Sequence, residues 1–308
     1  MQISIPVPPA FNFKRTAMSH GWRTLLPFEF DEAGWSITRV LTLEGDSAPV
    51  TIRITSLDGA ALLRVKAARR KPGRCDIARI TRDVRHMFRL DDEMSVFYAA
   101  VADDPEFNWI VREGAGRLLR SPTVYEDLVK TICTTNCSWA LTTKMVAGLV
   151  NNLGEATPED GRRAFPTPEA MAAVPESFYR DVVRAGYRAS YFRELAERVA
   201  SGELDVESWM TSELSTDELK REMKRVKGVG EYAADNLLKL LGRYDCLALD
   251  SWVRATFSRL HAKGRTADDR KIARHYARFR EWRGLALWCD ITRDWIASND
   301  EGRTRNDE

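Results

Sequence analysis

Two predicted helices joined by the tripeptide Gly-Val-Gly constrain the fold of this chain more than any other stretch of its sequence. The first helix is expected to start at Ser215, whose side chain can cap it while Glu218 completes a capping box. It ends before Gly228, because glycine tolerates the backbone angles of a tight reversal. A second helix starts near Gly230, carries leucines at helical spacing and ends at Gly242. The pattern predicts a helix-hairpin-helix.

The turn between these helices is a candidate phosphate-binding site. Backbone N–H groups at a helix N-terminus attract anions, and Gly228 and Gly230 would let a phosphate come close. Lys227 adds positive charge beside them, and further basic residues precede the turn: Lys220, Arg221, Lys224 and Arg225. The alternative is an ordinary helix–helix turn, because Gly-x-Gly between helices is common.

Asp250 is the candidate catalytic residue. It follows Gly230 by twenty residues and stands before an apolar stripe, Val253, Phe257 and Leu260, that predicts another helix. Aspartate is a favoured N-cap, so a purely structural role is the alternative. The two roles are compatible, because a helix N-terminus stabilises the negative charge of the carboxylate and a carboxylate stabilises a cationic sugar.

The hydrophobic period changes along the chain from two to about 3.6 residues. Alternation over residues 50–55 and 63–67, with Asp58-Gly59 between, predicts a β-hairpin with one buried face. Helical spacing over residues 77–88 predicts a helix that covers this sheet, and later segments are helical almost throughout. One of them is expected to start with a capping box formed by Thr123 and Glu126.

These patterns predict an α+β fold. An N-terminal antiparallel β-sheet subdomain with its covering helix is expected over residues 1–105. An all-α, two-lobed helical bundle containing the helix-hairpin-helix follows over residues 106–298, and a charged tail over 299–308.

Composition excludes several classes of protein. The net charge of +2 means that nucleic-acid affinity must come from local clusters, such as the hairpin or the basic turn at 69–74. Five cysteines without a C-x-x-C pair argue against a disulfide scaffold, and no apolar run approaches the roughly 18 residues that span a membrane. The four histidines show no metal-ligand spacing. With no signal-peptide pattern at Met1–Pro6, a cytoplasmic protein is expected.

The Gly-Val-Gly turn followed by Asp250 resembles the defining motif of the helix-hairpin-helix (HhH-GPD) DNA glycosylase superfamily. Segments 125–136, 165–169 and 185–189 also resemble these enzymes, as does the order of sheet and helices. The likeness covers roughly residues 75 to 297 and, more loosely, the sheet. It implies a monomeric enzyme that binds damaged double-stranded DNA, flips one nucleotide out and cleaves its N-glycosidic bond, with Asp250 stabilising the oxocarbenium-like sugar.

Single residues indicate the branch of the superfamily. Bifunctional members carry a lysine nucleophile two positions after the second hairpin glycine, where this chain has Tyr232. An aromatic residue there resembles the monofunctional 3-methyladenine glycosylase II branch, which uses water. An alkylated, cationic purine is then the expected substrate, held by cation–π contacts worth about 0.5–2 kcal/mol per ring. No iron–sulfur cluster is expected, because Cys289 is the only cysteine after Cys246.

The resemblance also assigns the remaining site residues. The candidate base-pocket aromatics are Tyr232, Trp139, Tyr187, Trp282 and Trp288, each of which could instead belong to the core. The candidate DNA-binding residues are Lys227, Gly228, Val229, Gly230, Asn136 and Arg254. By motif alignment, the backbone carbonyls of Lys224, Val226 and Val229 would hold a monovalent cation.

Other functions fit part of the pattern. A bifunctional or oxidised-purine glycosylase of the same superfamily would share the hairpin and Asp250. A non-catalytic helix-hairpin-helix protein would use the hairpin only to hold the DNA backbone.

Overall fold

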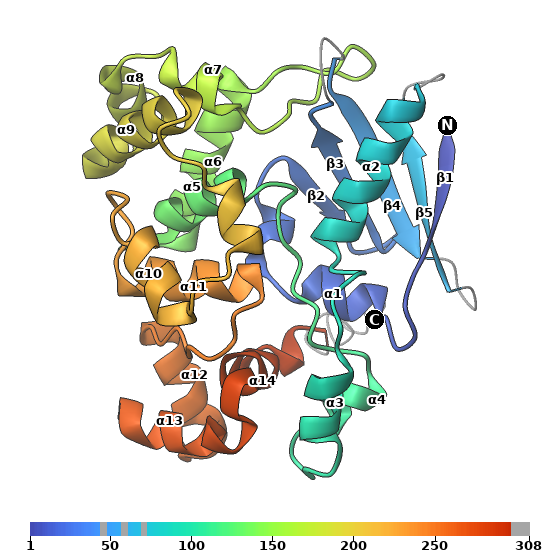
Figure 1. Cartoon of the computed structure of the whole chain (residues 1–308), viewed down its shortest axis with the longest axis vertical. Coiled ribbons are helices and arrows are strands. Elements are labelled where there is room, and N and C mark those ends of the chain that lie inside the picture. Colours follow the sequence, from blue (N-terminus) through green and yellow to red (C-terminus); the bar gives the residue numbers. More distant parts are fainter. Residues whose placement is uncertain (44–47, 57–60, 69–72, 297–308) are drawn as a thin grey trace, which may run out of the picture.

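The computed structural model describes residues 1–43, 48–56, 61–68 and 73–296. The predicted Asp58-Gly59 turn, the basic residues 69–71 and the charged tail 299–308 lie outside this part of the chain. In the described part, a sheet stands beside an extended helical region (Figure 1). The expected sheet-then-helices fold is confirmed.

Five antiparallel strands form the sheet in the order β1-β5-β4-β3-β2. The strands are β1 Gln2–Pro6, β2 Phe28–Asp31, β3 Ser36–Leu41, β4 Val50–Ser56 and β5 Leu62–Ala67. Ile54 of β4 pairs with Val65 of β5, and both side chains are fully buried while Arg53 is exposed. The alternation in the sequence therefore predicts the buried face correctly.

Helices make up the rest of the chain. The α-helices are α1 Phe13–Met18, α2 Arg74–Met87, α3 Ser95–Ala102, α4 Trp109–Arg112, α5 Val124–Thr134, α6 Trp139–Leu153, α7 Pro168–Ala172, α8 Glu176–Asp181, α9 Ala189–Ala200, α10 Thr216–Met223, α11 Glu231–Leu241, α12 Ser251–His261, α13 Asp269–Tyr276 and α14 Arg283–Ile291. Short 3-10 helices occupy Gly21–Thr24, Gly186–Arg188, Glu207–Thr211, Ala277–Trp282 and Arg293–Trp295. Among the described residues, no helix has both the length and the apolar character needed to cross a bilayer.

Helix α2 covers the sheet, as the spacing of its apolar residues predicts (Figure 1). Ile80, Val84 and Met87 of α2 are fully buried in the same cluster as the inward side chains of the strands. That cluster continues through α5, α6, α9 and α11, so the sheet and the first helical lobe share one core. A second cluster joins α3 and α4 to α12–α14 and forms the second lobe.

The capping box predicted for α5 is only half formed. Thr123 accepts the backbone N–H of Glu126, but the Glu126 side chain does not return to the cap. The Glu126 carboxylate instead accepts a hydrogen bond from Arg39 of β3 at 2.5 Å and forms an ion pair with Lys130 at 2.6 Å. All three side chains are at most 2% exposed, so burying one carboxylate required two cations beside it. This ion cluster ties α5 to the sheet.

Candidate active site

The hairpin between α10 and α11 has the predicted caps and reversal. Ser215 and Glu218 form a complete capping box, and the N–H of Val229 donates to the Val226 carbonyl at 3.1 Å. Gly228 has a φ of +89°, and a Cβ there would lie 2.8 Å from Cδ2 of Tyr191. Gly230 caps α11 with a φ of −90°, and a Cβ there would meet nothing within 4 Å. The fold therefore requires Gly228, whereas packing places no such demand on position 230.

The charges around the hairpin are largely paired with one another. Lys220 lies 2.5 Å from Glu231, and Lys224 contacts the same carboxylate. Hydrogen bonds from these lysines lower the pKa of Glu231 to about 2. Lys227 forms an ion pair with Glu194. The basic cluster is therefore less free than the sequence suggests, and the backbone N–H groups are the main attraction that the turn offers an anion.

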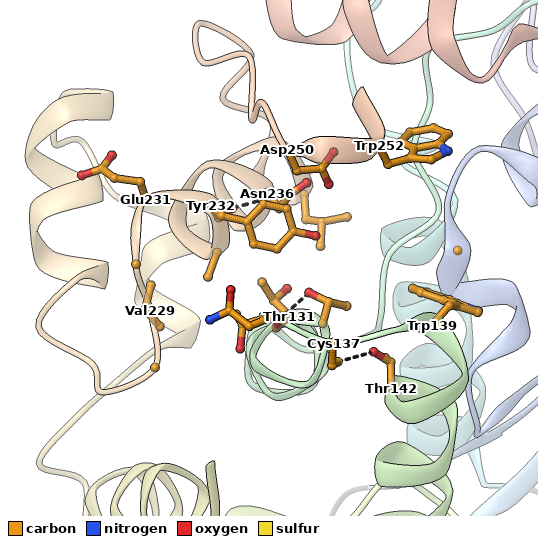
Figure 2. A pocket seen from close by; sticks show the side chains of 18 of the residues that line it. Thr131, Cys137, Trp139, Thr142, Val229, Glu231, Tyr232, Asn236, Asp250 and Trp252 are labelled. Atoms are coloured by element: carbon orange, nitrogen blue, oxygen red, sulfur yellow. Dashed lines mark hydrogen bonds between the residues drawn. The ribbon is translucent and has the colours of Figure 1, made fainter. Parts of the chain in front are cut away.

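A cavity of about 1340 Å³ opens beside the hairpin. Its walls come from the segment 20–24, the end of α5, the α5–α6 loop, the hairpin with α11, and the starts of α12 and α9 (Figure 2). Predicted site residues that line it are Asp250, Tyr232, Trp139, Tyr187, Trp288, Asn136, Lys224, Val226, Lys227, Gly228, Val229 and Gly230. The fold thus brings the candidate carboxylate, the hairpin and four of the five candidate aromatics to one opening.

Asp250 is both the N-cap of α12 and a cavity residue. Its Oδ1 accepts the N–H of Val253 at 2.7 Å, and within the described ranges this is the only hydrogen bond to the carboxylate. The side chain is half-buried and points toward the Tyr232 ring (Figure 2). Burial raises the pKa of Tyr232, and the negative charge of Asp250 raises it further. A hydrogen bond with Thr134 lowers this pKa in part. Position 232 therefore presents a neutral phenol beside a carboxylate.

Two candidate residues do not line the cavity, and for Trp282 the structure favours the core alternative. Trp282 packs in the second core, with its ring 5.6 Å from Tyr244 and 5.5 Å from Phe97, so it is a core residue. Arg254 forms an ion pair with Asp269 of α13 at 2.7 Å and does not line the opening. Helical periodicity could not separate these residues from true cavity residues, because it does not show which lobe covers a given helix face.

Several cavity aromatics were not singled out by the sequence. Trp252 is 41% exposed at the rim, although it stands only two residues after Asp250 and lies off the apolar stripe of α12. Trp22 stacks with Trp139 at 6.5 Å, and its indole N–H donates to Asp127 at 2.7 Å. The Trp139 ring lies directly on the backbone of Gly21, where a Cβ would come within 2.6 Å of it. The N-terminal segment therefore completes a wall that helical patterns alone could not predict.

Arg188 holds the loop that carries Asn136. Arg188 is 3% exposed, and its Nε donates to the Ile132 carbonyl and to the Thr135 hydroxyl, both at 3.2 Å. Asn136 itself is exposed with a φ of +45°, and its amide lies 3.4 Å from the Tyr187 hydroxyl. The left-handed backbone at Asn136 is thus fixed from below by a guanidinium, which presents the amide at the cavity mouth.

Two buried groups lie behind the cavity, and the sequence did not reveal either. Lys239 is 2% exposed, with Nζ 3.4 Å from Oδ1 of Asn236 and 4.0 Å from the ring centre of Trp288. Burial lowers the pKa of Lys239 to about 8, although the charges of Asp250 and Asp235 raise it. Burial also lowers the pKa of the cavity residue His20 to about 3, and Lys239 lowers it further.

The hairpin carbonyls of Lys224, Val226 and Val229 are the predicted ligands of a monovalent cation. Lys224, Val226 and Val229 all line the same opening. The Val226 carbonyl already accepts the N–H of Val229, but a carbonyl oxygen has a second lone pair. Carbonyl oxygens are suitable ligands for hard cations. A cation bound there would add positive charge next to the amides of the turn; its presence stays a prediction.

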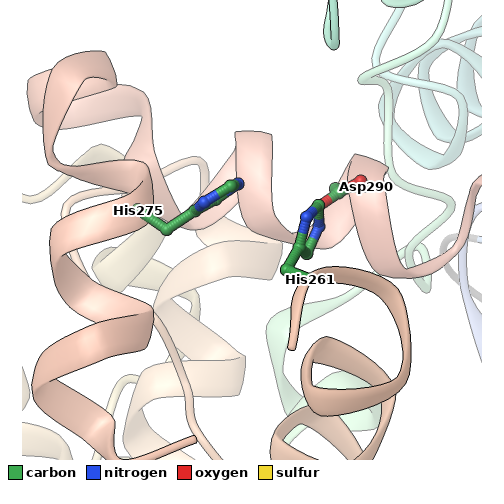
Figure 3. A group of neighbouring side chains, drawn as sticks. All are labelled: His261, His275 and Asp290. Atoms are coloured by element: carbon green, nitrogen blue, oxygen red, sulfur yellow. The ribbon is translucent and has the colours of Figure 1, made fainter. Parts of the chain in front are cut away.

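A histidine cluster in the second lobe corrects the expectation that the histidines are scattered (Figure 3). Ligand atoms of His261, His275 and Asp290 all lie within 4.8 Å of one another. Nε2 of His261 is 2.6 Å from Oδ2 of Asp290, which is a hydrogen-bond distance. Two ligands of a tetrahedral zinc would stand roughly 3.4 Å apart, given metal–ligand bonds of about 2.1 Å. The cluster is therefore an ion pair with a second imidazole beside it, tilted by 41° with its ring centre 4.3 Å from that of His261.

Comparisons with known proteins agree with this architecture. The sequence profile of the HhH-GPD superfamily base excision DNA repair proteins matches residues 129–281. A probable N-glycosylase/DNA lyase of Methanothermobacter thermautotrophicus is 25% identical, with 84% of this chain and 86% of the relative covered.

Two solved structures share the fold over nearly the whole chain. A 3-methyladenine DNA-glycosylase from Archaeoglobus fulgidus superposes with a TM-score of 0.73 at 20% identity, covering 96% of this chain and 98% of that one. The apo form of an 8-oxoguanine glycosylase/lyase from Clostridium acetobutylicum gives 0.72 at 19% identity, with 94% and 95% covered. The sheet and both helical lobes are thus part of one shared architecture.

Proposed function

Since this chain belongs to the HhH-GPD superfamily of base excision DNA repair proteins, we propose that it is a monofunctional DNA glycosylase that uses water. The observation that carries the proposal is the placement of Asp250. Its carboxylate lines the cavity beside Gly230 and Tyr232, and the cap bond from Val253 occupies only one of its oxygens. A nucleotide held by the hairpin could place its sugar next to this anion.

The chemistry needs one fixed negative charge at the sugar. As the C1′–N bond breaks, its electron pair leaves with the base and positive charge develops on the sugar ring. The Asp250 carboxylate stabilises that charge and can accept the proton of the water that attacks C1′. Because the helix N-terminus fixes the carboxylate before the substrate arrives, no reorganisation is needed during the reaction.

Asp250→Asn tests this role with its fold preserved. Asparagine caps helices about as well as aspartate, so the variant should fold and bind DNA. We expect release of a damaged base, scored as alkali-sensitive abasic sites in single turnover, to fall about 100-fold or more. Asp268→Asn is the matched control, because Asp268 caps α13 through the N–H of Lys271 at 2.7 Å but lies outside the cavity. Base release by Asp250→Asn equal to that of Asp268→Asn would remove Asp250 from the mechanism and favour a non-catalytic DNA-binding protein.

Tyr232 supports the water mechanism over a lyase mechanism. A phenol at this position has no amine to form a Schiff base with C1′. Borohydride added during turnover should therefore trap no covalent enzyme–DNA product. A trapped product would instead support the bifunctional activity that the name of the Methanothermobacter relative describes.

The partner and substrate follow from the same site. We propose that the partner is double-stranded DNA with one damaged base, bound by a monomer in the cytoplasm at the nucleoid, with affinity that falls steeply with salt. No cofactor is needed for the hydrolysis, and the hairpin cation would act only on phosphate binding. The preference for an alkylated purine stays a prediction that rests on Tyr232 and the tryptophans at the cavity.

A further inference from the structure

We propose that Lys239 is a specificity-determining residue whose buried ammonium makes the cavity select a neutral base with a hydrogen-bond acceptor over a cationic, N-alkylated purine. The inference rests on the proposed function, since it assigns a substrate class to the same cavity. It runs against the expectation of an alkylated purine, which rests on the aromatic residue in place of a lysine at position 232 and on cation–π contacts.

The position of Lys239 behind the cavity is the first observation. On α11, Asn236 and Lys239 follow Tyr232 by four and seven residues, so the three side chains share one face of the helix. Tyr232 and Asn236 line the opening, and the Lys239 ammonium lies one layer deeper, against Asn236 and the Trp288 ring. A base that enters between these side chains approaches a fixed positive charge.

The charge also occupies the ring that would otherwise attract a cation. Trp288 lines the cavity, and the Lys239 ammonium already lies 4.0 Å from its ring centre. A second cation on the same indole gains less from the ring and is repelled by the first one. The aromatic character of the cavity therefore does not by itself favour an alkylated base.

Lys239 also orients the side-chain amide of Asn236 at the cavity wall. Its ammonium donates to Oδ1 of Asn236, while Nδ2 of Asn236 donates one N–H to the Tyr232 carbonyl at 2.9 Å. An amide has two N–H groups, so one donor is left over for the cavity. A carbonyl or ring nitrogen of a neutral base can accept it. A purine alkylated on that nitrogen cannot.

Other groups around Lys239 do not cancel its charge. His20 is neutral at physiological pH because burial lowers its pKa to about 3. Its Nδ1 is buried and has no hydrogen-bond partner in the described part of the chain. Asp250 and Asp235 are the acidic residues that act on Lys239, and Asp235 is engaged by Lys220 at 2.7 Å. Only Asp250 remains as a free counter-charge, and it is assigned to the sugar.

Two variants separate the charge from the hydrogen bond. Lys239→Met removes both at similar volume, whereas Lys239→Gln removes the charge and keeps a donor for Asn236. Single-turnover release is measured from duplexes with one hypoxanthine, one 8-oxoguanine or one 3-methyladenine. We expect the wild type to release the neutral bases faster than 3-methyladenine. In Lys239→Met, the rate of 3-methyladenine release relative to neutral-base release should rise at least tenfold. Lys239→Gln should give most of that shift.

A pH profile gives a readout that a packing role would not move. Because burial lowers the pKa of Lys239 to about 8, the wild-type ratio should rise toward 3-methyladenine between pH 6.5 and 8.5 as the ammonium loses its proton. Among the described residues, the groups that act on Lys239 or its neighbours are His20, Asp235 and Asp250, and Arg89 donates to the Lys239 carbonyl at 3.1 Å. The Lys239→Met ratio should stay flat over this range.

The affinity of an inactive enzyme keeps this proposal separate from the proposed function. In the Asp250→Asn background, fluorescence anisotropy measures binding to the same three duplexes with and without Lys239→Met. If Lys239→Met changes the ratio of affinities for the cationic and neutral bases but the wild type releases no base, the glycosylase proposal is contradicted and the role of Lys239 in specificity is supported. The proposal for Lys239 would be overturned if the ratio of cationic to neutral base release stayed within twofold of the wild type in Lys239→Met and in Lys239→Gln, at unchanged stability. A borohydride adduct that Lys239→Met abolishes would also overturn it, because Lys239 would then be a nucleophile.

Discussion

The two hairpin glycines allow the demands of the fold to be separated from those of DNA. At Gly228, φ is +89° and a Cβ would lie 2.8 Å from the Tyr191 ring. The left-handed backbone costs alanine about 1–2 kcal/mol, and the overpacking adds about 1–3 kcal/mol. We therefore expect Gly228→Ala to lower the free energy of unfolding by about 2–5 kcal/mol, a large part of the roughly 5–15 kcal/mol available to a folded protein.

Gly230→Ala is the matched variant two residues away. Its φ of −90° suits alanine and its Cβ would meet nothing within 4 Å. The free energy of unfolding should change by no more than about 1 kcal/mol, because alanine restricts the unfolded chain but is a poorer N-cap for α11 than glycine. The added methyl group would, however, stand where a phosphate is proposed to approach the amides. We expect duplex affinity to fall roughly tenfold, or about 1.4 kcal/mol.

Urea unfolding followed by tryptophan fluorescence measures the stability of both variants, with an unchanged slope required for comparison. Anisotropy at two salt concentrations measures DNA binding. If Gly228→Ala is as stable as the wild type, the packing argument at Tyr191 is wrong. If Gly230→Ala binds duplex DNA as tightly as the wild type, phosphate does not approach the hairpin at this residue.

Three further predictions concern side chains at the cavity, below it and in the second lobe. Trp252→Phe should slow base release with little change in stability, because Trp252 is 41% exposed at the rim of the cavity. Trp282→Phe should lower the unfolding midpoint without slowing base release, because Trp282 packs in the second core. The reverse pattern would restore Trp282 to the site. Arg188→Lys should weaken damaged-duplex binding more than stability, since lysine lacks the planar guanidinium that donates to Ile132 and Thr135 in a fixed geometry. Binding equal to the wild type would contradict the positioning role of Arg188. The hydrogen bond to Asp290 raises the pKa of His261 above its usual value near 6.5. The pair therefore stabilises the fold fully below pH 6.5 and less as the pH rises through the pKa of the folded protein. His261→Gln should lose more stability at pH 6 than at pH 9, as measured by urea unfolding.

Local features of the sequence were sufficient where neighbours along the chain make the contact. The capping box at Ser215, the left-handed end of α11 at Gly242 and the cap at Asp250 all involve residues within a turn or two. The α10–Gly-Val-Gly–α11 hairpin follows from the same short-range rules. Alternation in β4 likewise predicts its buried face, because the side-chain period of a strand is set by the backbone.

Local rules did not predict the contacts between segments that are distant in the sequence, and one such contact replaced a predicted local one. Glu126 leaves its expected capping box because Arg39, from a strand 87 residues earlier, offers a charged partner in the interior. His261 and Asp290 meet from different helices, and only their packing creates the ion pair. Trp252 and Trp282 are both aromatic residues near helix starts, and nothing local separates the rim residue from the core residue.

The sequence by itself determined the two-part fold, the hairpin and the carboxylate at a fixed distance from it, because backbone periodicity and caps act over a few residues. Tertiary structure alone decided which aromatics line the cavity, how the hairpin lysines are neutralised and that the Lys239 ammonium lies behind the pocket. Burial and charge pairing depend on what folds over a side chain, and that partner can come from anywhere along the chain.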